Sequence, residues 1–376
     1  MLILISTGTI RDSKHNRFYP HIIESLKAIQ SAGHGIFLVS NHTKPNWLND
    51  ELKFIKFQLC RTRQDGKIVQ ALIAANDKVN LQHSEVVVFG VADEDLYMAV
   101  NSRTLLIRCE WASLGEKIQK YGVPWTEPKT TPELVDFLEN KKPWYFTSTG
   151  DFLDVYSLTE AGTRFESNLE VKRLVERLQN CLKNGHPELK NGFILHFLSS
   201  IYATSVFETA DIWGVYPSAS SKNDGSEIMG EFCALARAMY KKQYKEPVFI
   251  RHKPSVKRHI VGGDRNDPSS QLQTIHLNPF YHGKFKNKTI VVLDDYLNRG
   301  VSFGVSAALL KNAGAKKVIG LAMGKFGNCA LRYDIKLSDN PFTPVKQYTE
   351  VSRVPMMGTA TADAKLAFLK KFKVKV

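Results

Sequence analysis

The feature that most constrains the fold of this chain is an apolar run that leads into two adjacent acidic residues. Residues 290–293 are Ile-Val-Val-Leu, and Asp294 and Asp295 follow them directly. An uninterrupted apolar run of this kind is typical of a strand buried on both faces, as in a parallel sheet covered by helices. Open α/β sheets bind ligands at the carboxyl ends of their strands. Asp294 and Asp295 are therefore predicted at a binding edge, where they can accept hydrogen bonds from two neighbouring hydroxyls.

A short polar turn separates the acidic pair from a helix predicted over residues 305–311. The turn consists of Asn298, Arg299, Gly300, Val301 and Ser302. Unpaired backbone N–H groups and the helix dipole both attract an anion to the start of a helix. The segment therefore predicts a site for a phosphorylated sugar. The alternative is a strand that ends in a solvated Asp-Asp turn, with the glycine as an ordinary chain breaker.

Residues 290–302 resemble the phosphoribosyl-pyrophosphate motif of type I phosphoribosyltransferases, in which two acidic residues follow a strand and precede a glycine turn with Thr or Ser. The resemblance implies that Asp294 and Asp295 are the catalytic acidic pair and hold the ribose hydroxyls. It also implies that residues 298–302 hold the 5′-phosphate and that Mg²⁺ arrives bound to the substrate. Asn298 and Arg299 stand where the family has small hydroxyl or glycine residues, and Arg299 could add a charge-assisted contact.

A second loop is predicted to bind pyrophosphate. Residues 210–217 read as a strand that opens into a turn of small residues with one lysine, which offers free amides and a cation. The predicted loop residues are Ser218, Ala219, Ser220 and Lys222. The alternative is an ordinary Ser-rich turn.

A third segment, residues 254–279, is long, polar and without clear periodicity. Loops of this length are usually functional or disordered. Lys257 and Arg258 within it resemble the basic residues of the family's flexible loop, which closes over bound substrate. An exposed loop without a function is the alternative. Phe326, after a strand predicted over residues 318–322, is the residue that the resemblance implies for contact with the base.

The first part of the chain alternates strands and helices. Apolar strands are predicted over residues 2–5, 36–39 and 86–90, with amphipathic helices between them. Residues 1–110 resemble the haloacid dehalogenase-like phosphatase fold. Ile5 and Thr7 occupy the positions of that family's two catalytic aspartates.

The remaining motifs of the phosphatase resemblance are Ser40-Asn41, Lys67 and the acidic run 93–95. Because an isoleucine cannot act as a nucleophile, the resemblance implies a degenerate domain without catalytic activity. The alternative is an unrelated three-layer α/β domain. The predicted fold class is thus α/β with two domains, each a parallel sheet flanked by helices. The expected boundaries are 1–125 (haloacid dehalogenase-like), 126–185 (junction and helical hood), 186–335 (phosphoribosyltransferase-like) and 336–376 (basic extension).

The chain of 376 residues carries a formal net charge of +14. Such a charge favours a polyanionic partner or phosphate-rich substrates, although a solvated basic surface is the plain alternative. A nucleic acid could bind the basic surface and the tail, whose lysines are Lys370, Lys371, Lys373 and Lys375. The five scattered cysteines and the absence of long apolar runs favour a cytoplasmic protein that does not cross a membrane, and an oligomer is possible.

Three functions follow from these patterns. The first is a phosphoribosyltransferase-type enzyme that binds phosphoribosyl pyrophosphate or a nucleotide with Mg²⁺ and acts at the ribose C1 position. The second is a nucleotide-sensing regulator on the same fold. The third is an effector of a retron-like antiphage defence system that associates with nucleic acid.

Overall fold

The structure is a computed structural model that describes residues 1–75, 81–162, 169–184, 189–220, 227–255, 264 and 266–361. The chain forms two compact units. The first contains Met1–Lys141 with Ile201–Ala203 and Ala238–Lys241, and the second contains Lys142–Ser200, Thr204–Arg237 and Lys242–Val376. Both units are α/β. Within the described residues, no helix is long and apolar enough to span a bilayer.

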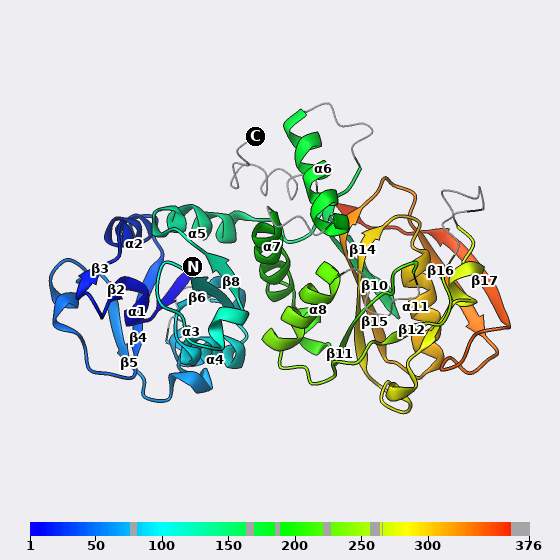
Figure 1. The fold of residues 1–376 in the computed structure, drawn as a ribbon, viewed down its shortest axis with the longest axis horizontal. Coiled ribbons are helices and arrows are strands. Elements are labelled where there is room, and N and C mark those ends of the chain that lie inside the picture. The colour runs from blue at the N-terminus through cyan, green and yellow to red at the C-terminus, as the bar shows by residue number, and fades with distance from the viewer. Residues whose placement is uncertain are drawn as a thin grey trace. The chain divides into compact units, whose positions relative to one another are not determined.

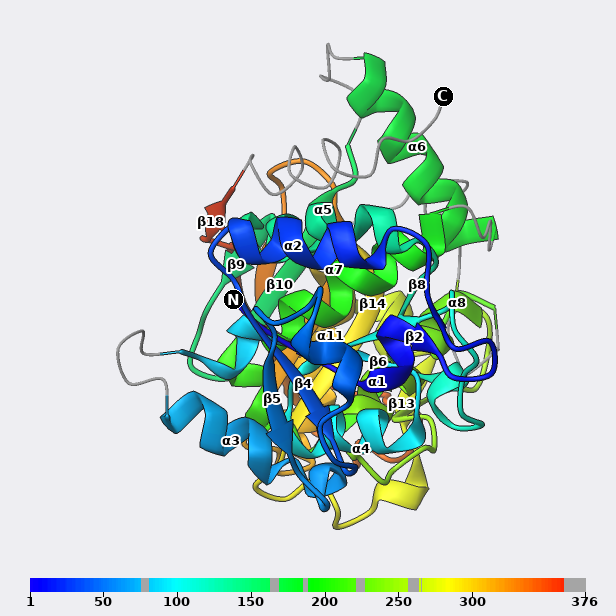
Figure 2. The same cartoon turned by 90° about the vertical axis from the view of Figure 1, so that its left-hand side faces the viewer.

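The first unit is a parallel six-stranded sheet between two layers of helices (Figures 1 and 2). The strands, in sheet order, are β5 (Lys56–Leu59), β4 (Gly35–Ser40), β1 (Leu2–Ile5), β6 (Val86–Gly90), β7 (Leu105–Cys109) and β8 (Val123–Trp125). Helices α2 (Ile22–Ser31) and α5 (Thr131–Asn140) cover one face, and α3 (Lys67–Ala74) and α4 (Asp93–Ser102) cover the other. The short elements α1 (Thr7–Ile10), β2 (Arg11–Asp12) and β3 (Arg17–Phe18) follow β1. All four residues of β1 are buried, as the apolar run predicts.

The second unit contains a mixed six-stranded sheet. Its strands, in sheet order, are β11 (Ile212–Val215), β14 (Thr289–Leu297), β15 (Lys317–Lys325), β10 (Leu153–Glu160), β9 (Phe146–Ser148) and β18 (Thr359–Ala360). The first four are parallel, whereas β9 runs antiparallel to β10 and to β18. The expectation of a purely parallel sheet is therefore wrong for this unit. The short connection between β9 and β10 permits only an antiparallel pair.

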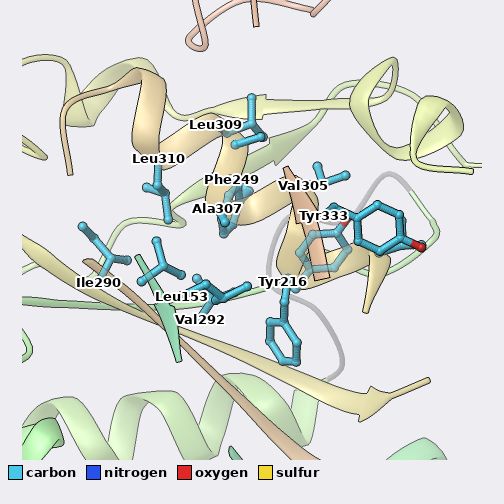
Figure 3. Close-up of a cluster of buried hydrophobic side chains, with 14 of the residues drawn as sticks. Leu153, Tyr216, Phe249, Ile290, Val292, Val305, Ala307, Leu309, Leu310 and Tyr333 are labelled. Carbon is cyan, nitrogen blue, oxygen red and sulfur yellow. The ribbon is translucent and has the colours of Figure 1, made fainter. Parts of the chain in front are cut away.

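Strand β14 lies between two layers of apolar side chains. Ile290 and Val292 belong to one buried cluster with residues of α11 (Val301–Asn312), among them Val305 and Leu309 (Figure 3). Val291 and Leu293 are also fully buried, and the alternation of a strand turns them to the opposite face. Helices α7 (Lys190–Tyr202) and α8 (Glu227–Met239) lie on that side of the sheet (Figure 1).

Several predicted elements have different bounds in the structure. Strand β14 continues through the acidic pair to Leu297, because β15 pairs with it along its whole length. Residues 254–279 are not one loop: they include α10 (Ser269–Leu272) and β13 (Ile275–Leu277), which pairs with β12 (Phe249–Arg251).

Two further predicted segments, the helical hood and the basic extension, also contain regular structure. The expected junction and helical hood, residues 126–185, includes α6 (Leu169–Asn184). Part of the expected basic extension forms a hairpin of β16 (Leu331–Leu337) and β17 (Tyr348–Pro355), followed by β18. The lysines of the tail lie outside the described residues.

Candidate functional site

The acidic pair lies where β14 extends beyond its neighbour β11. Pairing with β11 ends at Leu293, whose carbonyl accepts a hydrogen bond of 2.7 Å from the backbone N–H of Tyr216. On the other side, pairing with β15 continues from Asp294 to Leu297. Asp294 and Asp295 are half-buried. The pair is thus held by β15 on one side, and β11 does not continue alongside it on the other.

Asp294 and Asp295 have different electrostatic environments. Burial raises the pKa of the Asp294 carboxyl well above its ordinary range, and the negative charge of Asp295 raises it further. A hydrogen bond with the Ser302 side chain opposes these effects. Oδ1 of Asp294 also accepts the backbone N–H of Asp295 at 2.9 Å. The Asp294 carboxyl therefore holds a proton more readily than an ordinary aspartate, and it can donate to or accept from a sugar hydroxyl.

The turn after β14 requires glycine at Gly300. This residue is the N-cap of α11 and has a φ of 79°, which favours glycine. A Cβ atom there would lie 2.2 Å from the carbonyl oxygen of Leu331. The backbone N–H of Leu331 in turn donates to the carbonyl of Arg299 at 3.1 Å. The start of β16 therefore holds the turn in place.

The predicted phosphate-binding residues surround the start of α11. Asn298 is exposed, whereas Arg299 and Ser302 are half-buried. In the described part of the chain, the backbone N–H groups of Val301 and Ser302 have no backbone acceptor. The turn thus presents amides, a hydroxyl and a guanidinium group on the segment that follows the acidic pair.

A buried arginine links several parts of the site. Arg251, at the end of β12, is only 2% exposed. Its guanidinium donates hydrogen bonds to Oγ1 of Thr274 at 2.7 Å, to Oε1 of Gln271 at 2.8 Å and to the carbonyl of Pro217 at 3.3 Å. Arg251 therefore connects the β12–β13 pair to the loop after β11.

Arg251 also interacts electrostatically with the acidic pair. Burial lowers the pKa of its guanidinium, and the nearby Tyr216 and Asp294 raise it. The hydroxyl of Tyr216 donates to Oε1 of Gln271 at 2.9 Å, which completes a polar cluster beside the end of β11. The local sequence signal for Arg251 is its place at the start of the basic run Arg251-His252-Lys253, directly after a short apolar run.

The predicted pyrophosphate loop follows β11 directly. The hydroxyls of Ser218 and Ser220 lie 2.8 Å apart, and the carbonyl of Ala219 accepts the backbone N–H of Ser255 at 3.0 Å. This loop is therefore connected to the segment after β12, near Arg251. Lys222 lies outside the described residues.

The predicted flexible loop falls between two paired strands. Phe249 pairs with Leu277 and Arg251 with Ile275, so that β12 and β13 hold the two ends of the intervening segment together. Lys257 and Arg258 lie outside the described residues.

Phe326 packs against the end of the strand that carries the acidic pair. Its ring centroid is 4.9 Å from that of Tyr296, and its backbone N–H donates to the carbonyl of Leu297 at 2.9 Å. Burial and then the charge of Asp295 raise the pKa of Tyr296. Nearby on β15, the Lys325 amine is buried, which lowers its pKa, and it lies 4.9 Å from the centroid of the Phe146 ring. Tyr296 was not predicted, whereas Lys325 belongs to residues 323–326, where the resemblance implies contact with the base.

The acidic pair alone does not form a metal-binding cage. Among the described residues, no group of three or more His, Cys, Asp or Glu side chains is arranged to hold a metal ion. The raised pKa of the Asp294 carboxyl makes it a weaker metal ligand than an ordinary aspartate.

The corresponding edge of the first unit is occupied by a buried ionic cluster. Asp95, which is fully buried, accepts hydrogen bonds from the Ser6 hydroxyl at 2.8 Å and from the backbone N–H groups of Val91 and Ala92 at 3.0 Å each. Nη1 of Arg63 lies 3.2 Å from Oδ1 of Asp95. This carboxylate is therefore surrounded by donors from its own unit.

The structure also shows the burial and hydrogen bonds of other residues on which the phosphatase resemblance depends. Ile5 is 3% exposed at the end of β1, and Thr7 begins α1. Oδ1 of Asp93 accepts the backbone N–H groups of Lys117 and Ile118, each at 2.9 Å. Lys67 is exposed at the start of α3, and the hydroxyl of Ser40 accepts the backbone N–H of His42 at 3.0 Å.

The sequence matches no protein-family model, and no curated protein matches it significantly. The assignment of a function therefore depends on the geometry of the two sheet edges.

Proposed function

We propose that the second unit is a phosphoribosyltransferase-type enzyme that binds phosphoribosyl pyrophosphate, or a related nucleotide, with Mg²⁺. The observation that carries the proposal is the acidic pair at the open end of β14, followed directly by the glycine turn at the start of α11. Two carboxyls and a set of backbone N–H donors at this spacing are complementary to a pentose diol and its 5′-phosphate.

In the proposed reaction, a nitrogen nucleophile attacks C1 of the ribose as the bond to pyrophosphate breaks. Asp294 and Asp295 orient the 2′ and 3′ hydroxyls, and the negative charge of Asp295 stabilises the positive charge that develops on the ring. The amides and Arg299 of the turn hold the 5′-phosphate in place. Mg²⁺ carried by the substrate offsets the charge of the departing pyrophosphate.

The decisive experiment is a calorimetric titration with phosphoribosyl pyrophosphate and Mg²⁺. We expect micromolar binding by the wild-type protein, on the order of −8 kcal/mol, and no measurable binding by Asp294→Asn/Asp295→Asn. These substitutions keep the shape of both side chains and remove their charge. Asp151→Ala, at an exposed acid that precedes β10 and lies outside the site, is the matched control and should bind like the wild type. Equal binding by the double variant and the wild type would refute the proposal.

For the first unit, we propose a haloacid dehalogenase-like domain without phosphatase activity. Its support is the use of Asp93 and Asp95 as internal hydrogen-bond acceptors and the apolar Ile5 at the end of β1. Metal-dependent release of phosphate from a chromogenic phosphate ester should be absent from the wild type. Turnover that is lost in Asp95→Asn would contradict the proposal.

A nucleotide-sensing regulator, including an effector of a retron-like defence system, is the second candidate. Arg299 favours it, because a half-buried guanidinium group in the phosphate turn can tighten the hold on a bound nucleotide without assisting the reaction. The two candidates differ in turnover. An enzyme releases pyrophosphate from its bound substrate when an acceptor base is supplied, whereas a sensor retains its ligand unchanged.

A further inference from the structure

The second unit carries a cluster of lysines at the edge of the sheet opposite the acidic pair. Lys288 immediately precedes β14, and Lys316 immediately precedes β15. Since these strands are parallel, both lysines lie at the edge where the strands begin. The backbone N–H of Lys316 donates to the carbonyl of Lys288 at 2.8 Å, so the two positions are adjacent.

Three more lysines extend this cluster. Lys286 lies next to Gly314: a Cβ atom added to this glycine would be 3.8 Å from the Cα of Lys286. Lys284 places its Nζ 3.4 Å from the centroid of the Phe280 ring and 5.6 Å from that of Tyr244. Lys245 follows Tyr244 directly and is exposed. We name this surface the amino-edge patch; it consists of Lys245, Phe280, Lys284, Lys286, Lys288 and Lys316.

Few acidic groups neutralise the amino-edge patch. Lys288 pairs with Asp211 at 3.2 Å, and Glu246 is exposed beside Lys245. Within the described residues, the other four lysines form no ion pair, and three of them are exposed while Lys284 is half-buried against its aromatic neighbours. Unpaired lysines at adjacent positions repel one another, so that a polyanion gains by neutralising them.

The patch also contains an exposed aromatic ring. Phe280 is 45% exposed. Its ring packs edge-on against Tyr281, whose hydroxyl donates to the carbonyl of Glu246 at 2.7 Å. The ring is thus held in position while nearly half of its surface remains accessible. A fixed aromatic surface among lysines combines the two elements by which single-stranded nucleic acids are bound.

We infer that the amino-edge patch binds single-stranded nucleic acid, with the lysines on successive phosphates and a base stacked on Phe280. The inference does not depend on the proposed enzymatic function, because the patch and the acidic pair lie at opposite ends of β14. A duplex presents phosphates to the lysines but no accessible base face to Phe280, so the arrangement favours a single strand.

The experiment is fluorescence anisotropy of the full-length protein with a labelled oligothymidylate of about 12 nucleotides, over a series of salt concentrations. With four unpaired lysines engaged, the logarithm of the association constant should fall with the logarithm of salt concentration at a slope of about −3. Lys284→Gln/Lys286→Gln/Lys316→Gln should reduce the magnitude of that slope by about 2. Phe280→Leu, which retains apolar volume, should weaken binding about fivefold or more.

The matched control is Lys27→Gln/Lys53→Gln/Lys120→Gln, which removes the same charge from exposed positions of the first unit. This variant should keep the wild-type slope. Equal losses in the two triple variants would show that net charge or the carboxyl-terminal lysines are responsible, and would overturn the inference. So would undetectable binding by the wild type, or a duplex that binds as tightly as the single strand.

Discussion

The carboxyl edges of the two sheets contain acidic residues in different environments. In the first unit, Asp95 is fully buried, accepts three hydrogen bonds from its own unit and lies 3.2 Å from the Arg63 guanidinium. In the second, Asp294 is half-buried beside a second carboxyl, and its pKa is raised. We call the edge with Asp95 the satisfied edge, because its acid faces a cation. We call the edge with Asp294 the strained edge, because two carboxyls lie side by side there. The comparison shows two ways of accommodating an acid at the edge of a sheet: beside an internal cation, or beside a second carboxyl with a raised pKa.

The largest expected effect comes from breaking the satisfied edge. Arg63→Ala leaves the Asp95 carboxylate buried without a cation, which should lower the free energy of unfolding by about 3–5 kcal/mol. Arg61→Ala, at an exposed arginine two residues earlier, should change it by less than about 0.5 kcal/mol. Urea denaturation followed by circular dichroism measures both. A loss below about 1 kcal/mol in the first variant would mean that Arg63 does not compensate Asp95.

A smaller loss is expected from the glycine that forms the phosphate turn. Gly300→Ala combines an unfavourable φ with a Cβ placed against the Leu331 carbonyl, and it should cost about 3 kcal/mol and abolish binding of phosphoribosyl pyrophosphate. Gly314→Ala, at the other end of α11, has a similar φ of 83° but no atom within 3.8 Å, and it should cost about 1 kcal/mol without affecting binding. Equal costs in the two variants would contradict the close contact at Gly300.

The strained edge should respond in the opposite direction. Asp294→Asn removes the repulsion with Asp295 and should raise the free energy of unfolding by about 1 kcal/mol at neutral pH while it weakens ligand binding. The same substitution at Asp95 should destabilise the protein, because it leaves Arg63 without its counter-charge. Stabilisation by both substitutions, or by neither, would remove the distinction between the two edges.

The smallest effect is a pH dependence with a defined sign. Because the pKa of Asp294 is raised above its ordinary value of 3.8, the folded protein binds more protons than the unfolded chain between these two values. The contribution of Asp294 to stability therefore decreases as the pH rises through that interval. The stability difference between Asp294→Asn and the wild type should increase from about pH 4 to pH 8, as measured by denaturation at each pH. A constant difference would indicate an ordinary pKa.

Local sequence patterns predict the strands whose formation depends on neighbouring residues in the sequence. The run at residues 290–293 is a strand, and the acidic pair follows it at the carboxyl edge of the sheet. The continuation of β14 to Leu297 was missed because residues 294–296 are not apolar; the hydrogen bonds that extend it come from β15, a separate segment.

The contacts of the two buried arginines join distant segments, so the sequence does not show them. Arg251 bonds to Pro217 and Thr274, which lie 34 and 23 positions away in the sequence. Nothing around Arg63 indicates that Asp95 is its counter-charge, since the pairing depends on how β4, β6 and α4 pack. Likewise, β18 has only two residues, and its place beside β9 depends on the whole intervening fold.

The hydrogen bond between the Asp295 amide and the Asp294 carboxyl offers a direct spectroscopic reporter. It gives the carboxyl an internal partner at 2.9 Å, and this bond should change when a sugar hydroxyl binds the same carboxyl. Occupation of the site should therefore shift the ¹⁵N resonance of that amide before any change elsewhere in the sheet. A single labelled residue could then follow ligand arrival, independently of whether turnover occurs.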